Sequence, residues 1–182
     1  AEFKPPNFKV DLSLNKKFIT PNQEIEANLQ SNYLFGAPVE GGKAKYYVTR
    51  SKENFIPQGW DKFSFGREWF WPEESPEVDS YVQEGSQLLD TEGKNKQTIK
   101  VADDLPFAMK YQVDAAVSDV SNLSVSNSQN FTALPSDRLI GLENEFVADA
   151  GKPFSVNVIV TDPEGKAIAG EKIKLQLQQM DH

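Results

Sequence analysis

The sequence predicts an all-β protein: one complete antiparallel β-sandwich with a long aromatic inserted loop, followed by the first strands of a second, truncated sandwich. Three observations support this prediction. Apolar residues alternate with polar ones along most of the chain, which is the period of a strand with one buried face. No window has a convincing helical period. A segment near the start of the chain also recurs near its end.

The expected strands follow one another from the N-terminus to residue 133. Four stretches alternate clearly, and three shorter or weaker ones complete a set of about seven strands, the number found in an immunoglobulin- or fibronectin-III-like sandwich. The clear stretches are residues 8–14, 25–35, 44–48 and 109–117, and the others are residues 87–89, 99–101 and 123–133. We predict this fold for the first part of the chain.

Residues 54–84, here called the insert, interrupt the alternation with prolines, glycines and a run of aromatic residues. A segment of this kind is expected to be a long connection rather than a regular strand. Its aromatic side chains could stack on a ligand such as a sugar, anchor a neighbouring domain, or cover an open end of the sandwich as a local core. The residues leave these three alternatives open. The candidate contact residues are Phe55, Trp60, Phe63, Phe65, Trp69, Phe70 and Trp71.

The repeat joins residues 25–48 to residues 154–177, at an offset of 129 positions and without a gap. Paired glycines and lysines coincide in addition to the apolar alternation, which chance does not easily supply. A repeated unit predicts a repeated structure, here the first three strands of another sandwich. We therefore assign residues 1–135 to the first domain, and residues 136–182 to a linker and the N-terminal part of a second domain.

A truncated second sandwich has a physical consequence. Three strands would bury only one layer of a two-layer fold and would leave the inner face and a sheet edge uncovered. Residues 139–182 are therefore expected to pack on the first domain or on another copy of the chain. The second case would be self-association through the truncated domain.

A glycine-rich loop lies between two of the expected strands, at residues 34–42. A phosphate-binding loop delivers backbone amides at a helix N-terminus, whereas here a proline removes one amide and a strand follows. Glycine permits a sharp bend, and the residue before a proline is held extended. We interpret the segment as a structural corner that carries the chain between sheets. We assign to this corner Tyr33, which directly precedes the loop, and Phe35, Gly36, Pro38, Val39 and Gly41 within it.

Composition excludes several classes of function. The net charge of −8, from 19 Lys and Arg against 27 Asp and Glu, argues against a nucleic-acid partner. The absence of cysteine removes disulfides, thiolate metal sites and cysteine nucleophiles. The single histidine, His182, has no partners for a catalytic triad nearby. We predict no enzyme activity, no catalytic or metal-binding residue and no cofactor.

Several motifs carry a family resemblance. The segment "SNYLFGAPVEGGKAKYYVTR" contains the Tyr-x-Phe-Gly-x-Pro-Val pattern of a macroglobulin-like domain, and it resembles the bacterial branch of the α2-macroglobulin family. The stretches "FKPPNFKVDL", "FSFG" and "YQVDAAVSDVS" resemble further elements of such a domain. The segment from "LIGLEN" at residue 139 to "KLQL" at residue 177 resembles the opening of the next one. The resemblance covers nearly the whole chain, which we expect to be a fragment of a longer parent protein.

The resemblance implies a role in trapping proteases. In whole members, cleavage of a bait segment triggers a conformational collapse, and often a Cys-x-Glu-Gln thioester captures the protease. This chain has no cysteine for a thioester. Residues 72–86 are a bait candidate only because they lack a regular strand or helix pattern. The resemblance therefore implies a scaffold module of a broad-spectrum endopeptidase inhibitor. Its partners would be neighbouring macroglobulin-like domains and, through the parent, proteases.

The resemblance also implies a periplasmic or cell-envelope location, with the parent lipid-anchored to the inner membrane. Two alternatives come from other classes. One is a carbohydrate-binding or adhesin-type sandwich of a cell-surface protein, which would use Trp60, Trp69 and Trp71. The other is a tandem β module of a surface filament or of an outer-membrane assembly factor.

Overall fold

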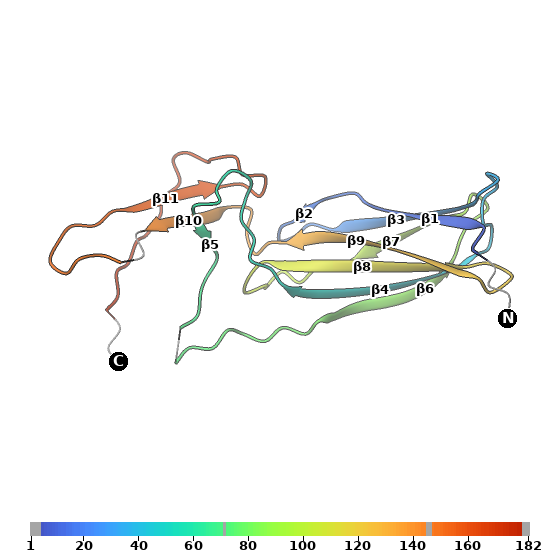
Figure 1. Cartoon of the computed structure of the whole chain (residues 1–182), viewed down its shortest axis with the longest axis horizontal. Helices are drawn as coiled ribbons and strands as arrows, with labels where there is room; N and C mark the ends of the chain where they lie inside the picture. The colour runs from blue at the N-terminus through green and yellow to red at the C-terminus, as the bar shows by residue number, and fades with distance from the viewer. Residues whose placement is uncertain (1–4, 71, 145–146, 180–182) are drawn as a thin grey trace. The chain divides into compact units, whose positions relative to one another are not determined.

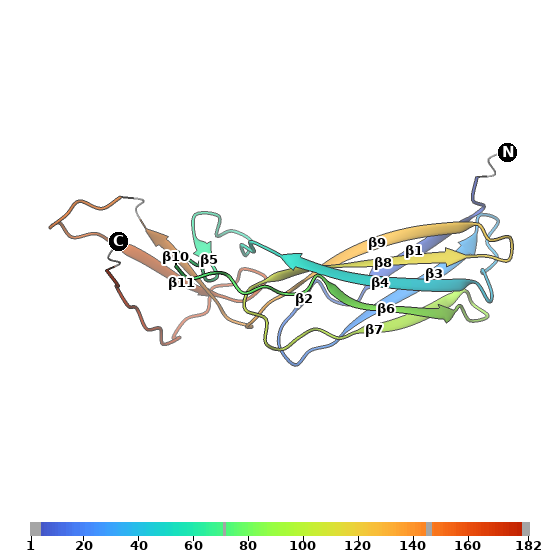
Figure 2. The same ribbon diagram turned by 90° about the horizontal axis from the view of Figure 1, so that it is seen from below.

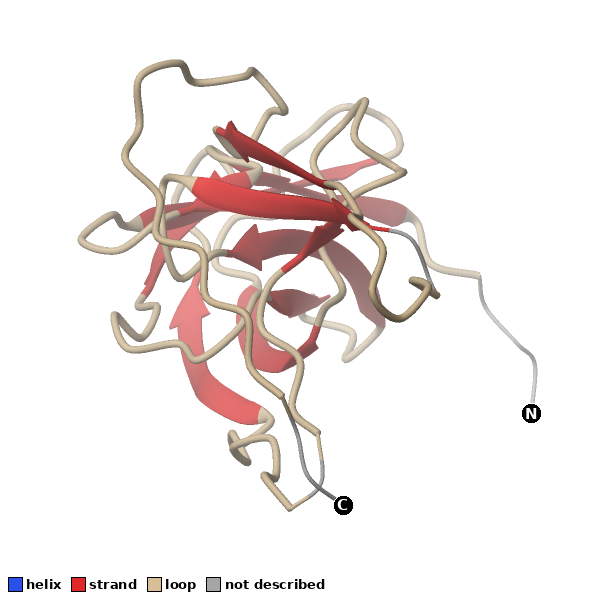
Figure 3. Cartoon of the chain, turned by 90° about the vertical axis from the view of Figure 1, so that its left-hand side faces the viewer, coloured by secondary structure: helices blue, strands red, loops and turns tan. Residues whose placement is uncertain are grey.

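The computed structural model describes residues 5–70, 72–144 and 147–179. The described residues form strands, turns and loops without a helix (Figure 3), so the all-β prediction is confirmed. The chain divides into two compact units. The first unit contains residues 1–54 and 67–137, and the second contains residues 55–66 and 138–182. The chain therefore passes from one unit to the other three times.

The first unit is an antiparallel sandwich of two sheets (Figures 1 and 2). One sheet contains, in spatial order, β1 (Phe8–Leu14), β3 (Ile25–Tyr33) and β7 (Lys94–Ile99). The other contains β2 (Phe18–Ile19), β9 (Ser124–Ala133), β8 (Met109–Ser118), β4 (Lys43–Lys52) and β6 (Tyr81–Leu88). Neighbouring strands run antiparallel, except that the short β2 lies parallel to β9.

The core of the first unit follows from the alternation. Every second residue of β8, and most of the alternate residues of β1 and β3, are buried, as are Ala44, Tyr46 and Val48 of β4, so the inner faces of the two sheets pack against each other. Complete burial of one large apolar side chain contributes about 1.5–3 kcal/mol. Ser31 is the polar exception on β3, and its Oγ donates a hydrogen bond of 2.8 Å to the carbonyl oxygen of Lys9. The buried hydroxyl is thereby satisfied.

The strand predicted at residues 123–133 is confirmed as β9 (Ser124–Ala133), each residue of which pairs with β8. Two other strands differ from their predicted extents. β7 ends at Ile99 and begins at Lys94, directly after a turn, because its mainly polar residues pair with β3. β6 begins at Tyr81, inside the insert that was expected to be irregular. Pairing along β4 holds this polar segment at the sheet edge, and it removes residues 81–86 from the candidate bait segment.

The second unit contains a three-stranded antiparallel sheet in the order β11 (Val156–Thr161), β10 (Leu139–Asn144) and β5 (Ser64–Phe65). Strand β5 comes from the insert, so residues 55–66 leave the first unit and complete the second. The linear division at residue 135 did not anticipate this exchange, and that boundary stays a prediction. A segment of the insert thus pairs with one edge of β10, while apolar side chains of β10 and β11 such as Ile140 and Val156 stay exposed. The expected packing of residues 139–182 on the first domain or on another copy stays a prediction.

The repeat predicted a third strand of the second sandwich near residues 172–177, and this prediction is wrong. Residues 171–179 form no strand, and the side chains of Ile173, Leu175 and Leu177 are exposed. A strand requires a hydrogen-bonded neighbour. Its counterpart in the first unit, β4, lies between β6 and β8, and no strand among the described residues of the second unit takes their place.

Candidate functional site

The corner of the first unit connects β3 in one sheet to β4 in the other. The backbone of Gly36 has φ of +104°, in a region that glycine enters without strain. Its N–H donates a 2.8 Å hydrogen bond to the carbonyl of Tyr33, and the N–H of Val39 donates one of 3.0 Å to Ser31. These amides point into the protein rather than toward a ligand. This geometry supports the interpretation of residues 34–42 as a structural element.

The second unit repeats this corner, which confirms the internal repeat. Gly165 has φ of +91°, and its N–H donates a 3.1 Å hydrogen bond to the carbonyl of Asp162. The N–H of Ile168 donates one of 2.8 Å to Val160. Each of these residues lies 129 positions after its counterpart. Two isolated bridges obey the same offset: Asn32 with Pro38, and Thr161 with Ala167.

The aromatic candidates of the insert are divided between the two units. Phe55, Trp60, Phe63 and Phe65 belong to the second unit, whereas Trp69 and Phe70 belong to the first. Trp71 lies outside the described residues. The sequence alone did not show which unit each aromatic residue belongs to, because that depends on which strand each part of the insert pairs with.

Trp60 holds the insert to the corner of the second unit. Its Nε1–H donates a 2.7 Å hydrogen bond to the carbonyl oxygen of Gly165. Its ring meets Phe63 edge-on, with 5.4 Å between the ring centroids. Farther along, Phe65 pairs with Gly141 across β5 and β10, and its ring fills the space that the glycine leaves. Trp60, Phe63 and Phe65 are each partly buried in the second unit.

Trp69 has a local structural setting in the first unit. Its ring meets Phe107 edge-on at 5.9 Å between centroids, and it packs against the apolar core. The ammonium of Lys52 lies 5.1 Å and the guanidinium of Arg67 lies 5.2 Å from the ring centroid, both as cation–π contacts. Phe70, in contrast, is 57% exposed. Of the described candidates, Phe70 is therefore the side chain most open to a partner.

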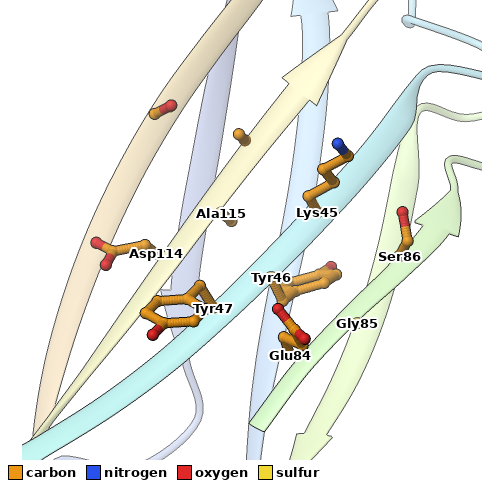
Figure 4. Close-up of a pocket in the computed structure, with 10 residues that line it drawn as sticks. Lys45, Tyr46, Tyr47, Glu84, Gly85, Ser86, Asp114 and Ala115 are labelled. Carbon is orange, nitrogen blue, oxygen red and sulfur yellow. The ribbon is translucent and has the colours of Figure 1, made fainter. Parts of the chain in front are cut away.

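The outer face of the larger sheet of the first unit holds an open hollow of about 530 Å³ (Figure 4). A cross-strand row places Ser126, Ala116, Lys45 and Ser86 side by side, and the three small residues lower the surface there. Figure 4 shows Lys45, Tyr47, Glu84 and Asp114 around the hollow. The remaining lining residues are Tyr46, Gly85, Ser86, Ala115, Ala116 and Ser126.

The hollow could not be predicted from the sequence, because its lining residues come from four strands. Only the cross-strand register shows that the small ones fall on one row. The ring of Tyr47 is 46% exposed and lies 6.0 Å from that of Tyr81. An aromatic face beside hydroxyls and carboxylates suits the surface of a sugar or a polypeptide. No group of three or more potential metal ligands occurs in the part of the chain that the structure describes.

Tyr46, beneath the hollow, has a structural role. Its ring is buried, and its hydroxyl donates a 2.9 Å hydrogen bond to Oδ1 of Asn95 on the opposite sheet. Burial raises the pKa of Tyr46 to about 12, because a phenolate would lose its hydration there. This tyrosine therefore stays neutral at physiological pH and links the two sheets.

The part of the chain that the structure describes includes no helix that could span a membrane.

Comparison with known proteins identifies the relatives of this chain. The family model of the bacterial alpha-2-macroglobulin MG5 domain matches residues 7–135. An alpha-2-macroglobulin homolog of Nostoc sp. is 57% identical over all 182 residues, which make up 10% of that protein. The chain thus spans about a tenth of the length of this relative.

Solved structures share the fold. The trypsin-activated alpha-2-macroglobulin of Escherichia coli aligns with 90% of this chain and 12% of its own, at 16% identity and a TM-score of 0.67. The Salmonella alpha-2-macroglobulin reacted with methylamine aligns with 92% of this chain and 12% of its own, at 17% identity and the same TM-score. The resemblance found in the sequence is confirmed: the chain belongs to the bacterial alpha-2-macroglobulin family.

Proposed function

We propose that the chain is a structural and interaction module of a bacterial α2-macroglobulin-like inhibitor of endopeptidases. In this role it positions neighbouring domains and carries neither bait nor thioester. The sequence supports the last point, because the 182 residues contain no cysteine. The observation that carries the proposal is the strand exchange: residues 55–66 leave the first unit and supply β5 to the second.

Strand exchange suits a scaffold that transmits a conformational change. A linker of a few residues would let the two units move independently. Here the second unit also contains β5 and the Trp60 loop, which the chain joins to the first unit at residues 54 and 67. A displacement of the second unit would therefore act on the first through three chain connections. In the parent, such a coupling would carry the collapse that follows bait cleavage from domain to domain.

The test replaces residues 55–66 of the parent protein by a Gly-Ser segment of equal length. Trypsin is expected to cleave the bait as before, because the proposal places the bait outside this chain. The decrease in radius of gyration after cleavage, measured by small-angle scattering, is expected to shrink together with protease inhibition. A control replaces residues 120–122, the exposed turn between β8 and β9 of the first unit, which lies outside the bait candidate. Unchanged collapse and inhibition in the 55–66 variant would overturn the proposal.

The proposal has consequences for partners and location. The direct partners are neighbouring macroglobulin-like domains of the parent, and proteases are reached only through the whole protein. The parent would lie in the periplasm or cell envelope, where it would meet foreign proteases. Cell fractionation with an antibody against the chain tests the location. A cytoplasmic signal would contradict it.

Carbohydrate binding is a second candidate function, and the hollow beside Tyr47 favours it. The exposed ring could stack on a sugar face while Glu84 and Asp114 accept hydrogen bonds from hydroxyls. A glycan array with the chain and its Tyr47→Ala variant tests this candidate. Trp60→Ala and Trp69→Ala test the surface considered from the sequence. Binding that depends on any of these rings would favour a carbohydrate module over a scaffold.

A further inference from the structure

The tips of the two equivalent corners differ in exposure: in the first unit the tip is open, and in the second it is covered. In the second unit, Pro163 at the tip of the corner is buried. In the first unit, Leu34 occupies the equivalent position and is 72% exposed, and Phe35 beside it is 78% exposed. Two large apolar side chains at a loop tip are unusual without a partner, since exposed apolar clusters commonly mark interaction sites.

The covered corner shows how such a tip is bound. The backbone of Gln58 lies so close to Gly165 that a Cβ on the glycine would come within 2.2 Å of the Gln58 carbonyl oxygen. Trp60 then donates its indole N–H to the Gly165 carbonyl at 2.7 Å. A turn in which the Trp60 N–H donates to Pro57 at 3.2 Å holds this loop in shape. The covering segment is thus a tight loop with one indole donor.

The open corner offers the same binding features. Gly36 has the backbone conformation of Gly165, and a Cβ placed on it would have no atom within 4 Å. No described residue donates a hydrogen bond to its carbonyl oxygen. Phe35 stacks on Tyr33 with 5.2 Å between ring centroids and 5° between ring planes. The stacked ring is held in place before any partner arrives, which lowers the entropy cost of binding.

We propose that Leu34, Phe35 and Gly36 form a docking site for the aromatic insert of another macroglobulin-like domain, the one that precedes this domain in the parent. A side-chain N–H of that insert bonds the Gly36 carbonyl, and its apolar residues cover Leu34, as the loop at residues 57–60 covers Pro163. Phe35 borders the contact, as the exposed Glu164 does at the covered corner. Each insert would thus bind the corner of the next domain, as residues 57–60 bind the corner at Gly165. The inference rests on the proposed function, because it requires a parent with tandem domains.

Thiol labelling tests whether the corner is covered. The chain has no cysteine, so Leu34→Cys gives one defined thiol, whose alkylation by N-ethylmaleimide is followed by peptide mass spectrometry. The thiol is expected to react about tenfold more slowly in the uncleaved parent than in the 182-residue chain, as for a site exposed only by local opening. Glu164→Cys is the matched control, because Glu164 is exposed at the covered corner. Its rate should be the same in both proteins.

A photo-crosslink identifies the occupant. p-Benzoylphenylalanine in place of Phe35 is expected to link, in the parent, to an aromatic segment of the preceding domain. A link to any other part of the parent, or equal Leu34→Cys rates in the two proteins, would overturn the inference. So would an intermolecular link between two 182-residue chains, because a second copy would then be the occupant. None of these readouts requires bait cleavage or collapse, so their failure is distinguishable from failure of the proposed function.

Discussion

Replacement of Gly141 by alanine tests whether the insert is an integral strand of the second unit. Gly141 lies on β10 opposite Phe65 of β5. An ideal Cβ on Gly141 would lie 2.5 Å from Cζ of the Phe65 ring, and 2.8 and 2.9 Å from its two Cε atoms. These distances are well below van der Waals contact. The phenyl ring must therefore move, and β5 must move with it or lose the ring contact.

The expected cost follows from two opposing effects. Overpacking typically costs about 1–3 kcal/mol. Replacing glycine inside a strand returns about 0.5–1 kcal/mol, because alanine loses less backbone entropy on folding. Gly141 does not have positive φ, so its backbone accepts alanine without further strain. Phe65 is only partly buried and its ring can turn outward. The overpacking cost should therefore lie in the lower half of its range. The second unit should lose about 1 kcal/mol.

The assay is a double-mutant cycle with Phe65→Ala. Native-state hydrogen exchange of the β10 and β11 amides reports the opening free energy of the second unit, and about 1.4 kcal/mol corresponds to tenfold in exchange rate. In the Phe65→Ala background, Gly141→Ala is expected to be neutral or stabilising, because the ring is gone. Additive effects, with equal loss of protection in both backgrounds, would refute the packing of Phe65 on Gly141.

The remaining predictions concern single side chains. Trp60→Phe removes the donor to Gly165 and should destabilise the second unit by about 1–2 kcal/mol, measured by exchange at β10 and β11 with β8 unchanged. Thr161→Val should stabilise the same unit by about 1 kcal/mol, because Oγ1 of Thr161 is buried without a hydrogen-bond partner among the described residues. A destabilised valine variant would show that the hydroxyl is paired. For Tyr46 the folded-state pKa of about 12 exceeds the ordinary 10.0. The folded state therefore holds the proton more tightly, and this stability, complete below pH 10, is lost as pH rises toward 12. By pH 11 the loss should reach about 1.4 kcal/mol, and urea denaturation should show that Tyr46→Phe lacks this dependence.

Much of the fold could be read from local patterns. The buried faces of β1, β3, β4 and β8 follow the period-two alternation, because the side chains of a strand point to opposite faces in turn. The repeated corner could be found as well, since Gly36 and Gly165 both occupy a backbone region that favours glycine. The mostly polar strands β6 and β7 were harder to predict. They lack a strong apolar face, and pairing with β4 and β3 decides their extent.

By itself, the sequence determined the fold class, the family resemblance, the repeat and the absence of cysteine chemistry. Each of these depends on residue identity and spacing along one chain. Only the tertiary structure decided where the insert belongs. Strand β5 has two residues, too few for any periodic signal, and its place beside β10 depends on a glycine that lies 76 positions away (Phe65 to Gly141). The same pairing assigned Trp60 to the second unit, whereas Trp69 belongs to the first. Residues 172–177 form no strand, because no described strand of the second unit takes the place that β6 and β8 have beside β4.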